Sequence, residues 1–196
     1  MSEAVATSAP AQGGEWTRGQ LGTLLLILAE TSFFCIFIVA YLFYIGKSLS
    51  GPYPHEVLTR PWLATVLLLS SSGTIVWAVR DLERGRLSSS LSWLFATILL
   101  GGAFLGFTAF EWYELIVHHG LTLSTNLFGT TYFSLVGFHA AHVTIGLLLM
   151  ILILVLGVLG HVKPAHAARV ELLSWYWHFV DVVWIAVFTV VYVVGY

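Results

Sequence analysis

The sequence predicts an all-α integral membrane protein, a bundle of five transmembrane helices. Two observations support this fold class. Of the 196 residues, 58% are hydrophobic and 9% are charged, and the mean hydropathy is +0.89. Soluble domains carry about 25% charged residues, so the composition excludes an ordinary soluble domain. The formal net charge of −2 gives no indication of a nucleic-acid partner.

The N-terminal segment, residues 1–18, precedes the first apolar run. It begins MSEAVATSAPAQGGEW and has neither a basic region nor an apolar core, so it does not resemble a secretory signal. Its Ala, Ser, Pro and Gly content predicts a disordered polar tail. The single cysteine, Cys35, lies in an apolar run and excludes a disulfide framework. We therefore expect membrane insertion to depend on the spans themselves.

Five apolar segments follow, and together they predict one transmembrane domain over residues 19–196. A span needs about 20 apolar residues. The second segment is short, and the fourth would be about 50 Å long at 1.5 Å per residue, so it must tilt or project beyond the lipid. Polar stretches with four prolines separate the segments. The segments cover residues 19–46, 61–79, 92–117, 127–159 and 172–195.

The distribution of positive charge predicts the orientation of the bundle. Five spans place the two termini on opposite sides. The side with the N-terminal tail carries six Lys and Arg residues and the other side carries two. An excess of positive charge marks the cytoplasmic side, so we expect a cytoplasmic N-terminus and a C-terminus on the periplasmic, outer side. The residues are Arg18, Arg80, Arg84, Arg86, Lys163 and Arg169 on one side, with Lys47 and Arg60 on the other.

Two further features have simple interpretations. Arg80, Arg84 and Arg86 lie near the predicted inner surface, where they are candidates for binding lipid headgroups or serve only as topological charge. Small residues, including the SSSG stretch at 70–73, let helices approach closely. The glycines expected to act in this way are Gly101, Gly102, Gly106, Gly137 and Gly146.

Seven ionisable residues fall within the predicted spans. A charged group in the bilayer costs at least a few kcal/mol and is a functional hypothesis by default. Six of the seven form pairs at spacing i, i+3, which places both members on one helix face. We expect each pair to present a polar patch to the bundle interior. The seven are Glu30 and the pairs Glu111/Glu114, His139/His142 and His178/Asp181.

A metal or haem site is one interpretation of these pairs, because Glu and His at i, i+3 occur in di-iron helical bundles. Depth argues against a shared site: counted along the helices, His178 lies about 10 Å from the inner face, Glu30 about 17 Å and Glu111 about 28 Å. Ligands must converge within about 2–2.5 Å of one ion. A haem held by two histidines is a further alternative. The simpler interpretation is that the histidines form interhelical hydrogen bonds, with Asp181 bonded to His178 or each bonded to a neighbouring helix.

Glu30 is the single ionisable residue of the first span. Burial away from water disfavours the charged form of a carboxylate, so we expect a neutral acid. Two compatible roles remain open. Glu30 is a proton relay or a modulator of one, or it is a carboxylic acid hydrogen-bonded to a histidine such as His142.

Four motifs give the chain a resemblance to a known family. They are LLSWYWHFVDVVWIAVFTVVYVVG near the C-terminus, FGTTYFSLVGFHAAHVTIG in the fourth span, FTAFEWYEL at the end of the third and AETSFFCIFIVAYLF in the first. With them the chain resembles subunit III of the haem–copper respiratory oxidases over residues 19–196. It departs from the family pattern at Phe110 and Trp112, and at Ala29, where the family has serine before its glutamate.

The resemblance carries several expectations. It implies the five-helix bacterial form, which lacks the first two of seven helices, in the bacterial cytoplasmic membrane. It implies a non-redox subunit of cytochrome c oxidase, with no catalytic residue, haem, copper or other metal on this chain and with haem and copper in partner subunits. Subunit I would be the direct partner, and subunit II, small subunits or a supercomplex would be others. Bound phospholipid and support of proton uptake are also implied, and Glu30 matches the family's carbodiimide-reactive glutamate.

Other functions remain as alternatives. The electron donor of the complex stays open, so the chain could serve a quinol oxidase, and the accessory protein of nitric oxide reductase is related. Two alternatives from other classes are an autonomous proton-conducting protein built around Glu30 and a membrane cytochrome b. Against autonomous transport, no continuous polar string, inverted repeat or broken helix is evident.

Overall fold

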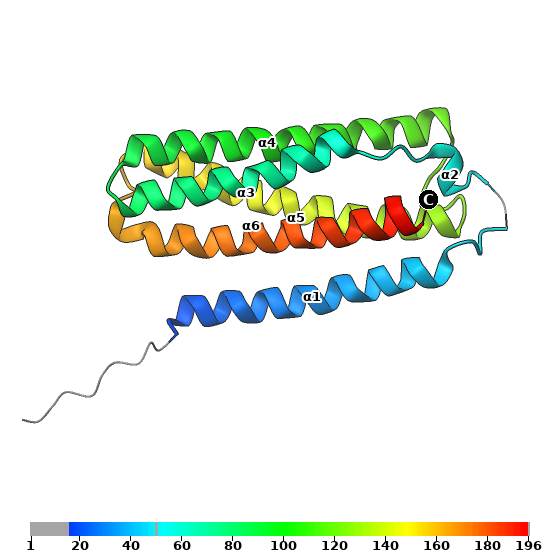
Figure 1. Cartoon of the computed structure of the whole chain (residues 1–196), viewed down its shortest axis with the longest axis horizontal. Helices are drawn as coiled ribbons and strands as arrows, with labels where there is room; N and C mark the ends of the chain where they lie inside the picture. Colours follow the sequence, from blue (N-terminus) through cyan, green and yellow to red (C-terminus); the bar gives the residue numbers. More distant parts are fainter. Residues whose placement is uncertain (1–15, 50, 196) are drawn as a thin grey trace, which may run out of the picture.

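The computed structural model describes residues 16–49 and 51–195, and within them the chain is helical with no strand. The five long helices lie side by side (Figure 1). All five are long and apolar enough to cross a membrane, which confirms the predicted fold class. Residues 1–15 of the predicted tail lie outside the described residues. The long helices are α1 (Arg18–Tyr44), α3 (Trp62–Glu83), α4 (Leu87–Tyr113), α5 (Leu127–Val158) and α6 (Ala167–Phe188).

Four short elements complete the described fold. The α-helical turn α2 (Pro54–Val57) lies between α1 and α3, and the 3₁₀ turn η2 (Pro164–His166) leads into α6. Two π-helical segments extend long helices: η1 (Glu114–His118) continues α4 and η3 (Thr189–Val194) continues α6. A π segment has a wider turn than an α-helix, so it shifts the direction in which the following side chains point.

Three helices extend beyond the apolar segments that predicted them. The second predicted span, residues 61–79, continues to Glu83, the third begins at Leu87 instead of residue 92, and the fifth begins at Ala167 instead of residue 172. Polar residues outside the hydrocarbon can continue a helix that an apolar run begins. As a result α3 and α4 are joined by a tight turn, in which Gly85 has a φ of 74° and the Arg86 N–H donates to the Asp81 carbonyl at 2.8 Å.

The core lies around α6. Helices α3 and α4 form an antiparallel hairpin, α6 contacts α3 and α5, and α1 lies against α5 and α6 (Figure 1). Trp177 and Trp184 of α6 are almost fully buried. A Cβ added at Gly146 would lie 2.7 Å from the Trp177 ring, and one at Gly101 would lie 3.0 Å from it. These two glycines therefore let α5 and α4 approach the indole, as predicted.

Not every predicted contact glycine has this role. A Cβ at Gly137 would meet the Trp112 ring at 3.3 Å, whereas Cβ atoms at Gly102 and Gly106 would meet nothing within 4 Å. Gly102 and Gly106 point away from the neighbouring helices, so the expectation of close helix approach is wrong for both. The sequence does not distinguish the two groups, because helix rotation decides which glycine faces a neighbour.

Helix α1 is peripheral. Within its most apolar 18-residue window 6% of the residues are buried, against 56% in the window of the span that contains α6. Phe34 and Tyr41 are the buried residues of α1. The start of α1, the α3–α4 turn and the α5–α6 connection share one end of the bundle, here called the N-terminal end, and α2 and the C-terminus share the other (Figure 1).

Candidate functional site

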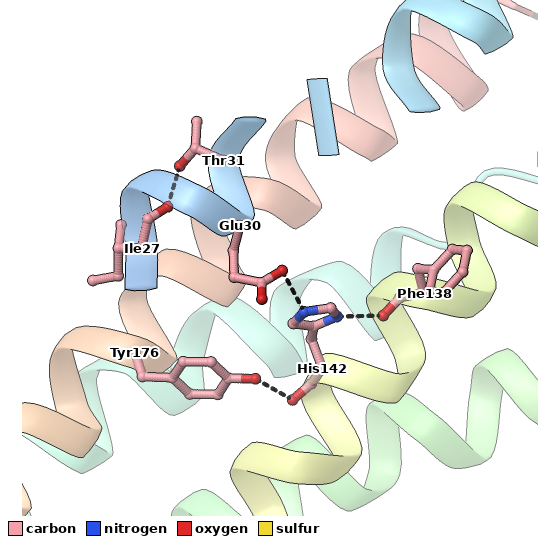
Figure 2. A network of polar contacts seen from close by, with 6 residues as sticks. All are labelled: Ile27, Glu30, Thr31, Phe138, His142 and Tyr176. Atoms are coloured by element: carbon pink, nitrogen blue, oxygen red, sulfur yellow. Dashed lines mark hydrogen bonds and ion pairs between the residues drawn. The ribbon is translucent and has the colours of Figure 1, made fainter. Parts of the chain in front are cut away.

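Glu30 of α1 and His142 of α5 form a direct contact between two helices. His142 Nε2 lies 3.1 Å from Glu30 Oε2, and the side chains are 14% and 28% exposed. Among the described residues this is the one side-chain hydrogen bond from α1 to another helix. Figure 2 shows the carboxyl group pointing from α1 toward the imidazole of α5. The histidine partner that the sequence left open for Glu30 is therefore His142.

The second ring nitrogen of His142 fixes how this contact is protonated. His142 Nδ1 lies 2.7 Å from the Phe138 carbonyl oxygen. A carbonyl oxygen only accepts, so Nδ1 carries a hydrogen and donates it. The proton between Nε2 and Glu30 then belongs either to a neutral carboxylic acid or to an imidazolium, and the same hydrogen bond serves both states. Either protonation arrangement keeps the hydrogen bond between α1 and α5.

Aromatic side chains surround the pair. The Phe34 ring lies 4.9 Å from the His142 ring, and Phe33 lies 6.4 Å from it. Tyr176 of α6 donates its hydroxyl hydrogen to the His142 carbonyl oxygen at 3.1 Å (Figure 2). The contact thus joins α1, α5 and α6 in an aromatic setting, where a hydrogen bond is stronger than in water.

His139 lies one turn before His142 and behaves differently. It is fully buried, and neither ring nitrogen has a hydrogen-bond partner among the described residues. Its ring stacks on Trp184 at 5.0 Å and meets the edge of Phe104 at 5.8 Å. The predicted interhelical hydrogen bond is wrong for His139. Residues three apart on a helix are rotated by about 60°, enough to turn His139 into the aromatic core and His142 toward α1.

His178 and Asp181 meet at a serine of α3. Ser72 Oγ lies 2.9 Å from His178 Nδ1 and also bonds Asp181 Oδ2. His178 Nε2 lies 3.2 Å from Ser174 Oγ of its own helix. Asp181 Oδ1 is buried and has no partner within the described part of the chain. Both residues therefore bond to a neighbouring helix, which was one of the two arrangements expected.

Helix α3 also accepts hydrogen bonds from both tryptophans of α6. Trp177 Nε1 donates to Ser71 Oγ at 2.8 Å, and Trp184 Nε1 donates to Thr65 Oγ1 at 3.1 Å. The sequence predicted only close packing for residues 70–73. The hydroxyls also bond, so α3 and α6 are held in register by side-chain hydrogen bonds.

Glu111 and Glu114 line the same cavity of about 450 Å³, but their polar partners differ. Both Glu111 oxygens accept from the Tyr192 hydroxyl, at 3.0 and 3.2 Å, and Tyr192 lies 3.3 Å from the Tyr132 hydroxyl. Glu114 instead lies 3.8 Å from His118 in an exposed contact. The shared face that the i, i+3 spacing predicted is therefore present, with the Glu114 side chain half-exposed. Tyr192 was not predicted as a partner of Glu111, because a neutral hydroxyl gives no charge signal in the sequence.

The three arginines lie exposed at the N-terminal end of the bundle. Arg80 and Arg84 are in or at the end of α3, and Arg86 directly precedes α4. Arg86 pairs with Asp81, which also accepts from Ser89. Asp81 fell outside the predicted spans, yet it is buried and fixes the α3–α4 turn.

The ionisable residues thus form separate contacts at different depths. Across residues 16–49 and 51–195, no group of three or more His, Cys, Asp or Glu side chains is placed to hold a metal ion. The described geometry supports hydrogen bonding between helices, and the contact between Glu30 and His142 is the one that joins α1 to α5 in this way.

Comparison with known proteins extends these observations. The sequence model of the family described as cytochrome c oxidase subunit III matches residues 14–196. The chain is 34% identical over 177 residues to "Cytochrome c oxidase subunit 3" of Alkalihalophilus pseudofirmus, covering 89% of this chain and 86% of that protein. It is 36% identical to the protein of the same name from Bacillus sp. (strain PS3), covering 89% and 85%. The Arabidopsis thaliana protein of that name is 36% identical over 181 residues, covering 87% of this chain and 66% of its own length.

Proposed function

The chain belongs to the cytochrome c oxidase subunit III family, and we propose that it acts as a non-redox integral subunit of an aerobic terminal oxidase. Family membership makes it a multi-pass membrane protein and a component of a haem–copper oxidase complex. In the proposed complex it packs against subunit I, with subunit II and smaller subunits nearby, in a bacterial cytoplasmic membrane. Haem and copper belong to the partner subunits, and this chain stabilises subunit I and supports its proton uptake.

The observation that carries this proposal is the family match over residues 14–196, which includes all five spans. Its test is gentle detergent extraction from native membranes with a tag on this chain, followed by mass spectrometry of the co-purifying proteins. We expect a large polytopic haem–copper subunit together with a copper-bearing partner. Recovery of the chain alone from membranes that contain an intact oxidase would contradict the proposal.

We propose a proton-related role for Glu30. Its side chain is 28% exposed and lies within a span, so an apolar reagent dissolved in the membrane can reach it. A carbodiimide reacts with the protonated acid, which is one of the two states that the Glu30–His142 contact allows. We expect dicyclohexylcarbodiimide to label Glu30 within the assembled complex and to leave Glu111, whose oxygens both accept from Tyr192, unlabelled. Peptide mass spectrometry of wild type and Glu30→Gln checks this assignment.

For the other intramembrane residues we propose a structural role. The bonds of Ser72 to His178 and Asp181, and of Tyr192 to Glu111, connect helices. Hydrogen bonds of this kind contribute about 0.6 kcal/mol each on average in membrane proteins. We also propose that the chain binds phospholipid, and that Arg80, Arg84 and Arg86 are headgroup ligands.

A further inference from the structure

The α3–α4 turn carries a cavity of about 280 Å³ at the N-terminal end of the bundle. Three guanidinium groups, one carboxylate and two indoles line it. The positive groups exceed the negative ones by two, so the cavity attracts anions. Its lining residues are Trp77, Arg80, Asp81, Arg84, Arg86 and Trp93.

The aromatic and basic residues of this cavity lie at different depths. Trp77 is seven residues before Arg84 on α3, and Trp93 is seven residues after Arg86 on α4. Seven helical residues span about 10 Å, so both indoles lie about two turns deeper in the bundle than the arginines of the turn. The two rings are 4.7 Å apart. The cavity therefore has a cationic rim and an aromatic floor.

Asp81 orders one side of the rim. It is 7% exposed, accepts from Ser89 and pairs with Arg86. These bonds hold the Arg86 guanidinium against the turn, so part of its conformational entropy is already lost before any anion arrives. Asp81 thus acts as a positioning residue for Arg86.

We propose that this cavity binds one phospholipid whose headgroup carries net negative charge. The phosphate lies among Arg80, Arg84 and Arg86, and the glycerol region with the start of the acyl chains lies against Trp77 and Trp93. Arginine binds phosphate oxygens with paired N–H donors, and indole rings favour the interfacial level between headgroup and chains. This inference rests on the proposed lipid-binding role and adds the site and the class of lipid.

The aromatic floor distinguishes a lipid from a soluble anion with the same phosphate chemistry. Inorganic phosphate would need only the rim, whereas a lipid also needs an apolar contact directly beneath it. Trp77 is 48% exposed, so its ring is available for that contact. A phosphatidylglycerol headgroup carries one negative charge, and the cavity has the capacity to neutralise it.

The test uses the intact, partly delipidated oxidase complex and native mass spectrometry. Phosphatidylglycerol and phosphatidylcholine with identical acyl chains are added to wild type, to Arg80→Gln/Arg84→Gln and to Arg169→Gln. Arg169 is an exposed arginine at the same end of the bundle, outside the cavity. Each basic residue near an anionic lipid contributes about fivefold in affinity, so we expect the double variant to lose about 10-fold or more in affinity for phosphatidylglycerol. Arg169→Gln should retain the affinity.

Two further measurements distinguish a lipid headgroup from a soluble phosphate as the bound anion. Trp77→Ala should weaken phosphatidylglycerol binding severalfold, and millimolar inorganic phosphate should not displace the lipid. Displacement by inorganic phosphate would overturn the proposal in favour of a soluble anion. A different outcome would show that the arginines bind protein instead. In that case the double variant would lose a partner subunit, and Arg84→Lys would keep that subunit but show no preference for phosphatidylglycerol.

Equal binding of both lipids to wild type would also overturn the proposal, as would equal losses in the double variant and Arg169→Gln. If the double variant fails to assemble, the two single variants Arg84→Gln and Arg84→Lys are compared. Arg84→Lys should then bind phosphatidylglycerol more tightly than Arg84→Gln. Oxygen reduction and subunit content are measured in the same preparations. If the wild-type complex reduces oxygen but does not prefer phosphatidylglycerol, only the proposed lipid site is contradicted. If the chain purifies without oxidase partners, the proposed function itself is contradicted.

Discussion

Glu30 Oε2 lies 3.1 Å from His142 Nε2, and the other nitrogen of the same imidazole donates to the Phe138 carbonyl. The contact joins a loosely packed helix to the bundle, and in the proposed proton-related role it would also hold a proton between α1 and α5. A structural role and a proton-related role can therefore be separated by substitutions that preserve the hydrogen bond and remove the transferable proton.

Glu30→Gln is such a substitution. The glutamine amide can donate to His142 Nε2 but cannot release a proton, so we expect full assembly and a change in turnover, or in its durability, of less than about threefold. That change corresponds to less than about 0.7 kcal/mol in an activation barrier. Oxygen consumption during prolonged turnover checks this, with Glu114→Gln as an exposed carboxylate control. Complete loss of oxygen reduction in an assembled complex would rule out a modulatory role.

His142→Phe and His139→Phe should have opposite effects on stability. The first leaves the buried side of Glu30 unpaired, which costs about 1–3 kcal/mol. The second removes two nitrogens that have no partner among the described residues and keeps a ring against Trp184, so stability should be unchanged or raised. The two variants are compared by the thermal unfolding midpoints of the purified complexes. A lower midpoint for His139→Phe alone would reveal a bond made by His139 in the assembly.

Asp181→Leu should destabilise the complex by about 1–3 kcal/mol, because Ser72 loses its acceptor. Asp181→Asn retains an acceptor oxygen and should cost less. Yield and thermal stability of the two variants check the ranking. Identical values for Leu, Asn and wild type would count against the proposed register contact between α3 and α6.

Gly129→Ala should lower the yield of folded complex strongly. A Cβ at this position would lie 2.2 Å from the Thr122 carbonyl oxygen, and the backbone of the η1–α5 connection would have to move, at about 1–3 kcal/mol. Gly102→Ala is the matched control, since a Cβ there meets nothing within 4 Å. Detergent-resistant complex is measured by size-exclusion chromatography, and equal yields for both variants would contradict the steric argument.

The five helices could be predicted because each is dominated by one long apolar run, and lipid leaves few other structures for such a run. Their ends were harder to place. Arg80, Asp81 and Glu83 are charged, yet they continue α3, since backbone hydrogen bonding does not stop at the membrane surface. Hydropathy detects contact with hydrocarbon, and a helix can extend beyond that contact.

The candidate site was only partly predictable. Glu30 was identified by its charge, and His142 was one of several possible partners. Ser72 was not predicted as the hydrogen-bond partner of His178 and Asp181, because a hydroxyl gives no charge signal in the sequence. Depth could have identified it: Ser72 lies eleven residues before the end of α3 at Glu83, and His178 lies eleven residues after the start of α6 at Ala167. Both ends are at the same side of the bundle, so the two residues lie at matching depth.

Helix rotation was the missing information elsewhere. The spacing i, i+3 allows both members of a pair to face the same neighbour, but an offset of about 60° can also divide them between two neighbours, as it does for His139 and His142. Glu111 and Glu114 stay on one cavity, yet Glu111 bonds to Tyr192 and Glu114 lies beside His118. These differences in partner cannot be predicted from residue types alone, because they depend on the packing of other segments.

The peripheral position of α1 also has a consequence for biosynthesis. Glu30 and His142 are separated by 112 positions in the chain, and translation adds about 5–20 residues per second. The acid on α1 therefore enters the bilayer roughly 6–20 seconds before its partner has been made. In the folded chain α1 contacts α5, α6 and η3, so these contacts can form only after the last part of the chain has been made. The helix that is synthesised first therefore completes its packing late.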